Sequence, residues 1–298
     1  MSEPTARDVG EFGLIAAVTS RLPLSDAVLL GPGDDAAVVA VPDGRVVATT
    51  DMLVEGVHFR RDWSSAYDVG RKAAAANLAD VAAMGGVATA LLVGLASPPD
   101  LPVRWALDLA DGLRDEAALV GAVVVGGDTV TASQVVVSVT ALGSLAGAPV
   151  TRSGAQVGDT VVLAGRTGRS AAGLRQLQQG TTEGPLVEAH RHPDPPYALG
   201  PALALAGASA MCDVSDGLVA DLGHLARASG VGIALQATLL EDPEVSLEDV
   251  LTGGEDHALV ATLRGPLPSG CRAIGTVVEG AGVLVDGRPV SGGWEHFA

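Results

Sequence analysis

Residues 73–96 read A-A-A-A-N-L-A-D-V-A-A-M-G-G-V-A-T-A-L-L-V-G-L-A. The alanine-rich first part predicts a helix over residues 67–84, which ends at Gly85 and Gly86 because glycine commonly terminates helices. The apolar residues that follow predict a strand over residues 88–96. A helix that leads directly into a strand indicates that the chain mixes α and β structure.

The same alternation continues on both sides of this stretch. The expected strands cover residues 36–41, 45–54, 123–125, 134–145, 160–164 and 210–214. The expected helices cover residues 9–21, 103–120, 198–207 and 217–229, with another starting at Ser170. Pro42-Asp43-Gly44 is typical of a tight turn and predicts a hairpin between the first two strands. The predicted class is α+β.

A change in composition divides the chain. Residues 146–158 are rich in glycine, proline and serine, and the alternation of strands and helices restarts after them. A chain of 298 residues is long enough for two domains. We therefore predict an N-terminal domain over residues 1–147 and a C-terminal α/β domain over residues 148–298.

The composition excludes several classes of protein. Hydrophobic residues make up 48% of the chain, which favours a packed core, and the formal charge is −17. Nucleic acids and anionic membranes need a cationic surface, so neither is an expected partner. The apolar runs are broken before about 18 residues, and residues 1–8 hold no apolar segment, so we expect a soluble, cytoplasmic protein. Cys212 and Cys271 are too isolated to predict a disulfide framework or a zinc site.

Several carboxylates lie at strand ends beside glycine, where a solvated surface charge is not expected. Asp51 ends the apolar run 46–50, and Asp128 follows the run 123–127. Further acids considered with them are Asp34, Asp35, Asp80, Asp213, Asp216, Glu255 and Asp256. Glycine allows close approach to a metal or phosphate, and converging carboxylates repel one another unless a cation lies among them. Oxygen ligands select Mg²⁺, Mn²⁺ or Ca²⁺, and phosphoryl transfer depends on such ions.

Each acid also has a simpler interpretation. Asp34 is compatible with a turn, Ser215 and Asp216 with a helix cap, and Asp80 with an exposed helix face. Only the recurrence of the pattern in distant parts of the chain favours a metal site.

Three familiar motifs are absent or incomplete. Residues 31–36 fit the loose dinucleotide pattern G-x-G-x-x-A, but a strand, not a helix, is expected after them. The P-loop sequence G-x-x-x-x-G-K-[ST] does not occur. The segment that begins at Asp213 resembles a calcium loop, but its glycine is one position early and its twelfth residue is His224 instead of glutamate.

Seven segments occur in a characteristic order. They read G-P-G-D-D-A (31–36), T-T-D-M-L-V-E-G-V-H-F (49–59), N-L-A-D-V-A-A-M-G (77–85), G-G-D-T (126–129), T-R-S-G-A (151–155), D-V-S-D-G-L (213–218) and G-G-E-D (253–256). Together they resemble the thiamine-monophosphate kinase family, of the superfamily that includes aminoimidazole ribonucleotide synthetase and selenophosphate synthetase. The resemblance implies a two-domain aminoimidazole ribonucleotide synthetase-like fold, whose N-terminal sheet pairs with that of a second subunit in a homodimer. It also implies in-line phosphoryl transfer from ATP to thiamine monophosphate, which gives thiamine diphosphate without a covalent phosphoenzyme.

The resemblance also implies roles by position. Several Mg²⁺ ions would be held by Asp35, Thr49, Thr50, Asp51, Asp80, Asp128, Asp213 and Asp216. The nucleotide would contact Gly127, Asp128, Arg152 and Ser215. Thiamine monophosphate would contact His58, Glu255 and Trp294. The residues expected to be catalytic are Asp51, Asp128 and Asp216.

The side-chain types suit these roles, although alternatives remain for two of them. Arg152 is a forked donor for phosphate oxygens, and Trp294 can stack on a thiazolium cation. Trp294 is equally compatible with a terminal core plug, and His58 with a surface position at a strand end. The chain departs from the family at His257, where tyrosine is usual, and this affects only the expected local packing.

Another enzyme of the superfamily is the first rival function. Selenophosphate synthetase uses a reactive cysteine or selenocysteine and a nearby lysine in its N-terminal segment, but residues 1–71 contain neither cysteine nor lysine. Aminoimidazole ribonucleotide synthetase fits the segment 49–59 poorly. A non-catalytic protein that stores metal or senses a nucleotide is the second rival, and it would not need His58, Glu255 or Trp294.

Overall fold

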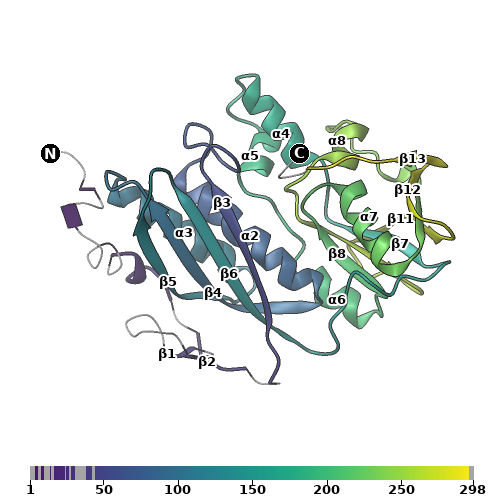
Figure 1. The fold of residues 1–298 in the computed structure, drawn as a ribbon, viewed down its shortest axis with the longest axis horizontal. Helices are drawn as coiled ribbons and strands as arrows, with labels where there is room; N and C mark the ends of the chain where they lie inside the picture. The colour runs from purple at the N-terminus through teal and green to yellow at the C-terminus, as the bar shows by residue number, and fades with distance from the viewer. Residues whose placement is uncertain are drawn as a thin grey trace. The chain divides into compact units, whose positions relative to one another are not determined.

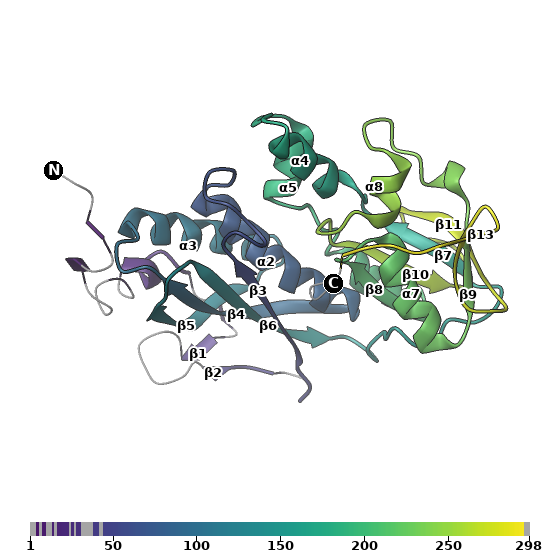
Figure 2. The ribbon, with the colours of Figure 1, turned by 45° about the horizontal axis from the view of Figure 1, so that its top comes forward.

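The computed structural model describes residues 4–5, 8–9, 14, 17–23, 25–26, 28–30, 38–41 and 44–294. The chain divides into two compact units (Figures 1 and 2). Unit 1 comprises residues 1–81 and 87–145, and unit 2 comprises residues 82–86 and 146–298. The division after residue 145 differs from the boundary predicted at 147–148, and the assignment of residues 82–86 to unit 2 was not predicted.

Unit 1 contains a four-stranded sheet with two long helices. The strand order is β3 (Val47–Val54), β6 (Val136–Leu145), β4 (Gly86–Ser97) and β5 (Val123–Thr131). The helices are α2 (Ala66–Ala83) and α3 (Val103–Ala118), close to the ranges predicted for them. A two-stranded sheet pairs β1 (Val28–Leu30) with β2 (Val38–Val39).

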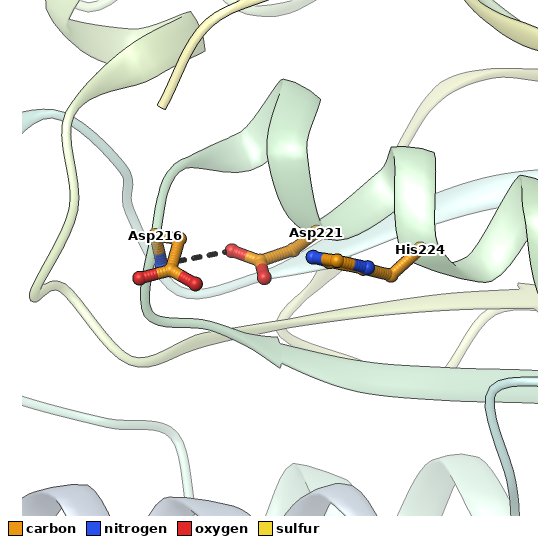
Figure 3. A group of neighbouring side chains, drawn as sticks. All are labelled: Asp216, Asp221 and His224. Atoms are coloured by element: carbon orange, nitrogen blue, oxygen red, sulfur yellow. Dashed lines mark hydrogen bonds between the residues drawn. The ribbon is translucent and has the colours of Figure 1, made fainter. Parts of the chain in front are cut away.

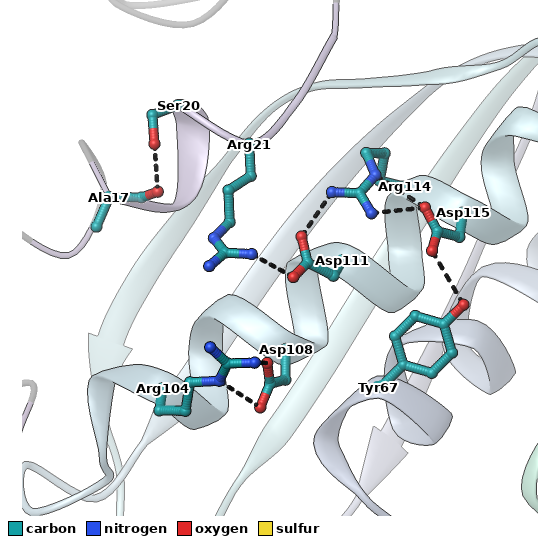
Figure 4. Close-up of polar contacts among 9 residues, drawn as sticks. All are labelled: Ala17, Ser20, Arg21, Tyr67, Arg104, Asp108, Asp111, Arg114 and Asp115. Carbon is teal, nitrogen blue, oxygen red and sulfur yellow. Dashed lines mark hydrogen bonds and ion pairs between the residues drawn. The ribbon is translucent and has the colours of Figure 1, made fainter. Parts of the chain in front are cut away.

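Backbone contact brings α2 and α3 together. A Cβ atom on Gly70 would lie 2.2 Å from the carbonyl oxygen of Leu109, and one on Gly112 would lie 2.1 Å from that of Tyr67. Only glycine permits so close a contact. Ion pairs then fix the outer side of α3, where Asp111 pairs with both Arg21 and Arg114 (Figure 4).

The predicted hairpin between residues 36–41 and 45–54 is wrong. β2 pairs with β1, whereas β3 pairs with β6 over its whole length, from Val47 opposite Gly143 to Val54 opposite Val136. The non-local hydrogen bonds between β3 and β6 therefore outweigh the local preference for a turn. Residues 42 and 43 of the predicted turn lie outside the described residues, as do residues 10–13, 15 and 16 of the predicted helix 9–21.

Unit 2 contains a seven-stranded sheet in the order β13, β12, β9, β11, β7, β10, β8. The strands are β7 (Thr160–Ala164), β8 (Ala210–Val214), β9 (Gly232–Leu235), β10 (Ala258–Leu263), β11 (Cys271–Val278), β12 (Gly282–Val285) and β13 (Arg288–Val290). The helices are α4 (Arg169–Gln178), α5 (Pro185–Arg191), α6 (Leu199–Leu205), α7 (Leu218–Ser229), α8 (Leu247–Thr252) and the short 3₁₀ helix η1 (Ala237–Leu239).

Both faces of this sheet are buried. Alternate residues of β7 enter different hydrophobic clusters: Val161 and Leu163 belong to one, and Val162 and Ala164 to the other. This is the two-residue period of a strand covered on both sides. Among the residues that the structure describes, no helix combines the length and apolarity needed to cross a membrane.

Candidate active site

In unit 1, oxygen donors gather where β3 faces α2. The Thr49 hydroxyl donates to Asp80 Oδ2 at 2.7 Å, and the backbone N–H of Asp51 donates to Asn77 Oδ1 at 3.1 Å. Asn77 is fully buried and its amide nitrogen donates to the carbonyl of Ala73, so its orientation is fixed. Alternate residues of a strand share a face, which places Thr49 and Asp51 together. Hydroxyl, amide and carboxylate oxygens of this kind fit Mg²⁺.

Thr50, also predicted to be a ligand, points the other way. Its hydroxyl donates to the carbonyl oxygen of Val139 at 3.0 Å and accepts from the Thr140 hydroxyl at 3.0 Å. The Thr50 side chain is therefore bonded to β6 and is not directed at the group that contains Asp51. Asp35 lies outside the described residues.

Asp128 lies on the opposite edge strand of the unit 1 sheet. It is exposed, and its carboxylate accepts from the backbone N–H of Thr129 at 2.8 Å. Strands β6 and β4 separate β5 from β3, which corresponds to about 14 Å at the usual strand spacing. The structure thus does not bring Asp128 together with Asp51 within unit 1.

His58 follows β3 and is held by hydrogen bonds of its ring and of its backbone. Its Nδ1 accepts from the N–H of Val54 at 3.0 Å, so a neutral ring carries its proton on Nε2. The chain's only lysine, Lys72 on α2, is 3% exposed and donates to the His58 carbonyl oxygen at 3.3 Å. The fixed tautomer leaves Nε2 as a hydrogen-bond donor.

In unit 2, a second acidic group forms where β8 turns into α7. Asp213, near the end of β8, is buried, and Asp216 follows in the turn. Asp221 Oδ2 accepts from the backbone N–H groups of Asp216 and Gly217, both at 3.1 Å, and so caps α7 (Figure 3). The ligand atoms of Asp216, Asp221 and His224 all lie within 4.8 Å of one another.

The electrostatics of this group favour a cation. Burial, followed by the negative charges of Asp213 and Asp216, raises the pKa of Asp221 to about 7. A divalent ion would relieve that repulsion, and the carboxylate donors fit Mg²⁺. Sequence reasoning missed Asp221 and His224 as members of the group. Their spacing was a usable signal, because residues three apart on a helix share a face.

The G-G-E-D segment docks against the same turn. Glu255 donates its backbone N–H to the Ser215 carbonyl at 2.8 Å, and His257 donates to that of Val214 at 3.0 Å. Glu255 and His257 have positive φ values of 65° and 52°, uncommon for residues other than glycine. A Cβ on Gly254 would lie 2.5 Å from the Ser215 carbonyl oxygen, so the close contact requires glycine there. The structure thus brings together Ser215 and Glu255.

Trp294 borders this turn, whereas the backbone of Arg152 lies at the other end of α7, where its carbonyl oxygen accepts from the Ser229 hydroxyl at 3.2 Å. The backbone N–H of Trp294 donates to the Asp216 carbonyl at 2.9 Å, and the side chain is 56% exposed, which rules out a buried core plug. Arg152 is exposed, and its neighbour Thr151 accepts from the N–H of Met211 on β8 at 3.0 Å. Both predicted ligand contacts are therefore in reach of solvent, but only Trp294 is shown beside the acidic group.

Asp256 is the capping acid of α4. Its two oxygens accept from the backbone N–H groups of Gly168 at 2.6 Å and Ser170 at 2.9 Å, and the side chain is buried. Burial raises the pKa of Asp256 from 3.8 to about 6, although the N–H groups of Ser170 and Gly168 lower it in part. The folded state therefore holds this proton more tightly than the unfolded chain does.

We predict a pH-dependent stability difference between the wild type and Asp256→Asn. The raised pKa contributes stability that is complete below about pH 4 and is lost as the pH rises through 6, whereas asparagine does not titrate. The free energy of unfolding of the wild type minus that of the variant should fall by roughly 2–3 kcal/mol between pH 4 and pH 7. Denaturant unfolding measures it, with the exposed Asp194→Asn as the matched control. A constant difference across this range would contradict the assignment.

Comparisons with known proteins agree with this architecture. Residues 33–145 match the family model of the AIR synthase related protein, N-terminal domain, and residues 156–285 match its C-terminal domain. A thiamine-monophosphate kinase of Mycobacterium tuberculosis is 50% identical over 99% of this chain and 93% of its own length. A crystal structure of thiamine-monophosphate kinase from Stenotrophomonas maltophilia has a TM-score of 0.79 at 32% identity, covering 93% of this chain and 95% of that one. The structure of AaThiL complexed with AMPPCP and TMP has a TM-score of 0.79 at 34% identity, covering 98% of each chain.

Proposed function

The chain belongs to the thiamine-monophosphate kinase family, and from that premise we propose that it phosphorylates thiamine monophosphate with ATP. An oxygen of the acceptor phosphate attacks the γ-phosphorus of ATP. The bond from that phosphorus to the bridging oxygen breaks, and ADP and thiamine diphosphate leave. A cytoplasmic location fits the use of ATP as the donor.

One observation supports this proposal most directly. The turn of Ser215 and Asp216 binds the backbones of Glu255 and Trp294, at 2.8 Å and 2.9 Å. Residues proposed for the nucleotide, the metal and the acceptor therefore lie on one framework within unit 2. Such preorganisation is what phosphoryl transfer needs, because most of its catalysis is positioning and charge stabilisation.

Mg²⁺ is the proposed cofactor. In unit 1 the residues that would hold it are Thr49, Asp51 and Asp80, and Asp35 and the Thr50 backbone are proposed with them. Asp128, on the opposite edge strand of the sheet, is proposed as a ligand apart from that group. In unit 2 they are Asp213 and Asp216. Bound Mg²⁺ would neutralise phosphate charge, which a chain of net charge −17 otherwise repels.

The protein's own groups have distinct parts. Arg152 and the Ser215 hydroxyl would orient the nucleotide phosphates, and Gly127 would admit the nucleotide beside Asp128. His58 would donate a hydrogen bond from Nε2 to thiamine monophosphate, and Glu255 would accept a hydrogen bond from it. No residue is needed as a covalent carrier.

The decisive experiment is incubation of the purified chain with ATP, Mg²⁺ and thiamine monophosphate, followed by chromatography of the products. Thiamine diphosphate and ADP should appear in equal amounts. Absence of the diphosphate would reject the proposed function. ATP or metal binding without turnover would favour the non-catalytic alternative.

Trp294→Ala is predicted to raise the KM for thiamine monophosphate about 5- to 30-fold, with little change in the KM for ATP. Loss of an indole that stacks on a thiazolium cation costs roughly 1–2 kcal/mol. Steady-state kinetics with each substrate varied in turn measures the effect. Trp105→Ala on α3 controls for the loss of an indole. Equal changes in both KM values would remove Trp294 from the acceptor site.

We also propose a homodimer, formed through the sheet of unit 1. That sheet carries exposed apolar side chains on three strands, among them Met52 (56%), Leu92 (36%) and Val130 (55%). Exposed apolar side chains favour burial against another protein, and the same sheet of a second copy of the chain is the simplest partner. Light scattering should give about twice the chain mass of 29.7 kDa. Met52→Glu should shift the mass toward the monomer, and Leu205→Glu, 91% exposed in unit 2, should not. A fully active wild-type monomer would refute the proposal.

A further inference from the structure

His257 makes a side-chain contact with Asp213 within unit 2. Its Nδ1 lies 3.2 Å from Asp213 Oδ2, and the two side chains are only 10% and 5% exposed. A carboxylate oxygen accepts, so the imidazole nitrogen carries the proton in this contact. Asp213 is one of the acids proposed above to hold Mg²⁺.

The backbone fixes the position of the ring. The N–H of His257 donates to Val214 on β8 at 3.0 Å, and Asp213 pairs with Leu259 across β8 and β10. The φ of His257 is 52°, a conformation in which histidine is more common than most other residues. The pairing of β8 with β10 therefore fixes both residues, because Asp213 lies in β8 and His257 directly precedes β10.

We propose that His257 is a positioning residue for Asp213. By donating Nδ1–H to Oδ2, it would restrict rotation of the carboxylate and leave Oδ1 to bind the ion. Hydrogen bonds from outer residues commonly orient metal ligands in this way. The inference rests on the proposed metal role of Asp213, and it assigns a function to a residue that does not itself touch ion or substrate.

The geometry also explains how the loop 253–257 serves the site. Its three polar side chains diverge: Glu255 approaches His190 at 3.8 Å, Asp256 caps α4, and His257 reaches Asp213. The alternating positive φ values produce this divergence. One short loop thereby positions Glu255, which is proposed to contact thiamine monophosphate, and orients Asp213, which is proposed to bind Mg²⁺.

Two substitutions separate positioning from packing. His257→Phe keeps a planar ring of similar size but removes the donor. His257→Asn keeps an N–H donor and tolerates positive φ. The probe is Mn²⁺ alone, which takes the same oxygen ligands as Mg²⁺, and electron paramagnetic resonance of the free ion gives the affinity and number of sites.

We expect His257→Phe to weaken one class of Mn²⁺ site by 10- to 100-fold, and His257→Asn to recover most of that affinity. In an Asp213→Asn background, His257→Phe should cause no further loss. Unchanged Mn²⁺ affinity in His257→Phe, or an equal loss in both His257 variants, would overturn the proposal. Further loss in the Asp213→Asn background would also overturn it. If the wild type binds Mn²⁺ but does not phosphorylate thiamine monophosphate, the proposed function fails while this test still stands.

Discussion

Asp51→Asn is expected to lower kcat by at least about 100-fold at saturating Mg²⁺. The substitution keeps the shape of the side chain but removes a charge from the group formed with Thr49 and Asp80. Stabilisation of phosphoryl charge by a metal is worth several kcal/mol, and each 1.36 kcal/mol corresponds to about tenfold in rate. The backbone N–H of Asp51 still donates to Asn77, so the fold should persist.

Steady-state kinetics across a Mg²⁺ titration measures this effect. EDTA should abolish wild-type turnover, and added Mg²⁺ should restore it. Asp62→Asn removes a charge from an exposed side chain in the same unit and serves as the matched control. Near-wild-type activity of Asp51→Asn at saturating Mg²⁺ would show that this carboxylate is not a ligand. Asp128→Asn is expected to cause a comparable loss, and it tests separately the carboxylate on the other edge strand.

The fold was predictable where local and non-local signals agree. The helix and strand of residues 73–96 appear as α2 and β4, because the helix ends at a glycine pair and the strand is apolar on both faces. The hairpin at residues 42–44 failed because a turn preference contains no information about β6, more than eighty residues away. Strand β5 was predicted to end at residue 125 but continues to Thr131, since pairing with β4 overrides the low strand propensity of glycine.

The candidate site shows a similar limit. The pattern of strand, glycine and acid predicted roles for Asp51, Asp213 and Asp216, but it did not reveal strand order. It therefore did not reveal that β3 and β5 are opposite edges of the sheet. Asp221 was missed because the pattern considered acids at strand ends, whereas Asp221 lies within α7 and its carboxylate accepts from the backbone N–H groups of Asp216 and Gly217. The departure at His257 suggested only altered packing, whereas the structure gives that residue a polar contact with Asp213.

Gly127→Ala is expected to destabilise unit 1 by about 3 kcal/mol or more. A Cβ on Gly127 would lie 1.9 Å from the Val93 carbonyl oxygen and 2.8 Å from its carbonyl carbon. These are backbone atoms of the paired strand β4, so they cannot move without breaking the β4–β5 ladder that carries Asp128. Overpacking usually costs 1–3 kcal/mol, and a clash with paired backbone belongs at the upper end of this range or beyond.

The adjacent glycine supplies a matched control for that prediction. A Cβ on Gly126 would lie 3.4 Å from Leu92 Cδ2, the end of a flexible side chain, so Gly126→Ala should be tolerated. Thermal unfolding followed by circular dichroism should show Gly127→Ala melting roughly 6–12 °C lower than the wild type, with Gly126→Ala close to the wild type. Because the ladder positions Asp128, Gly127→Ala should also lose activity below its melting temperature, and Gly126→Ala should not. Equal melting temperatures for the two variants would mean that β5 can shift away from β4 without cost, and the close approach would then not explain the glycine at residue 127.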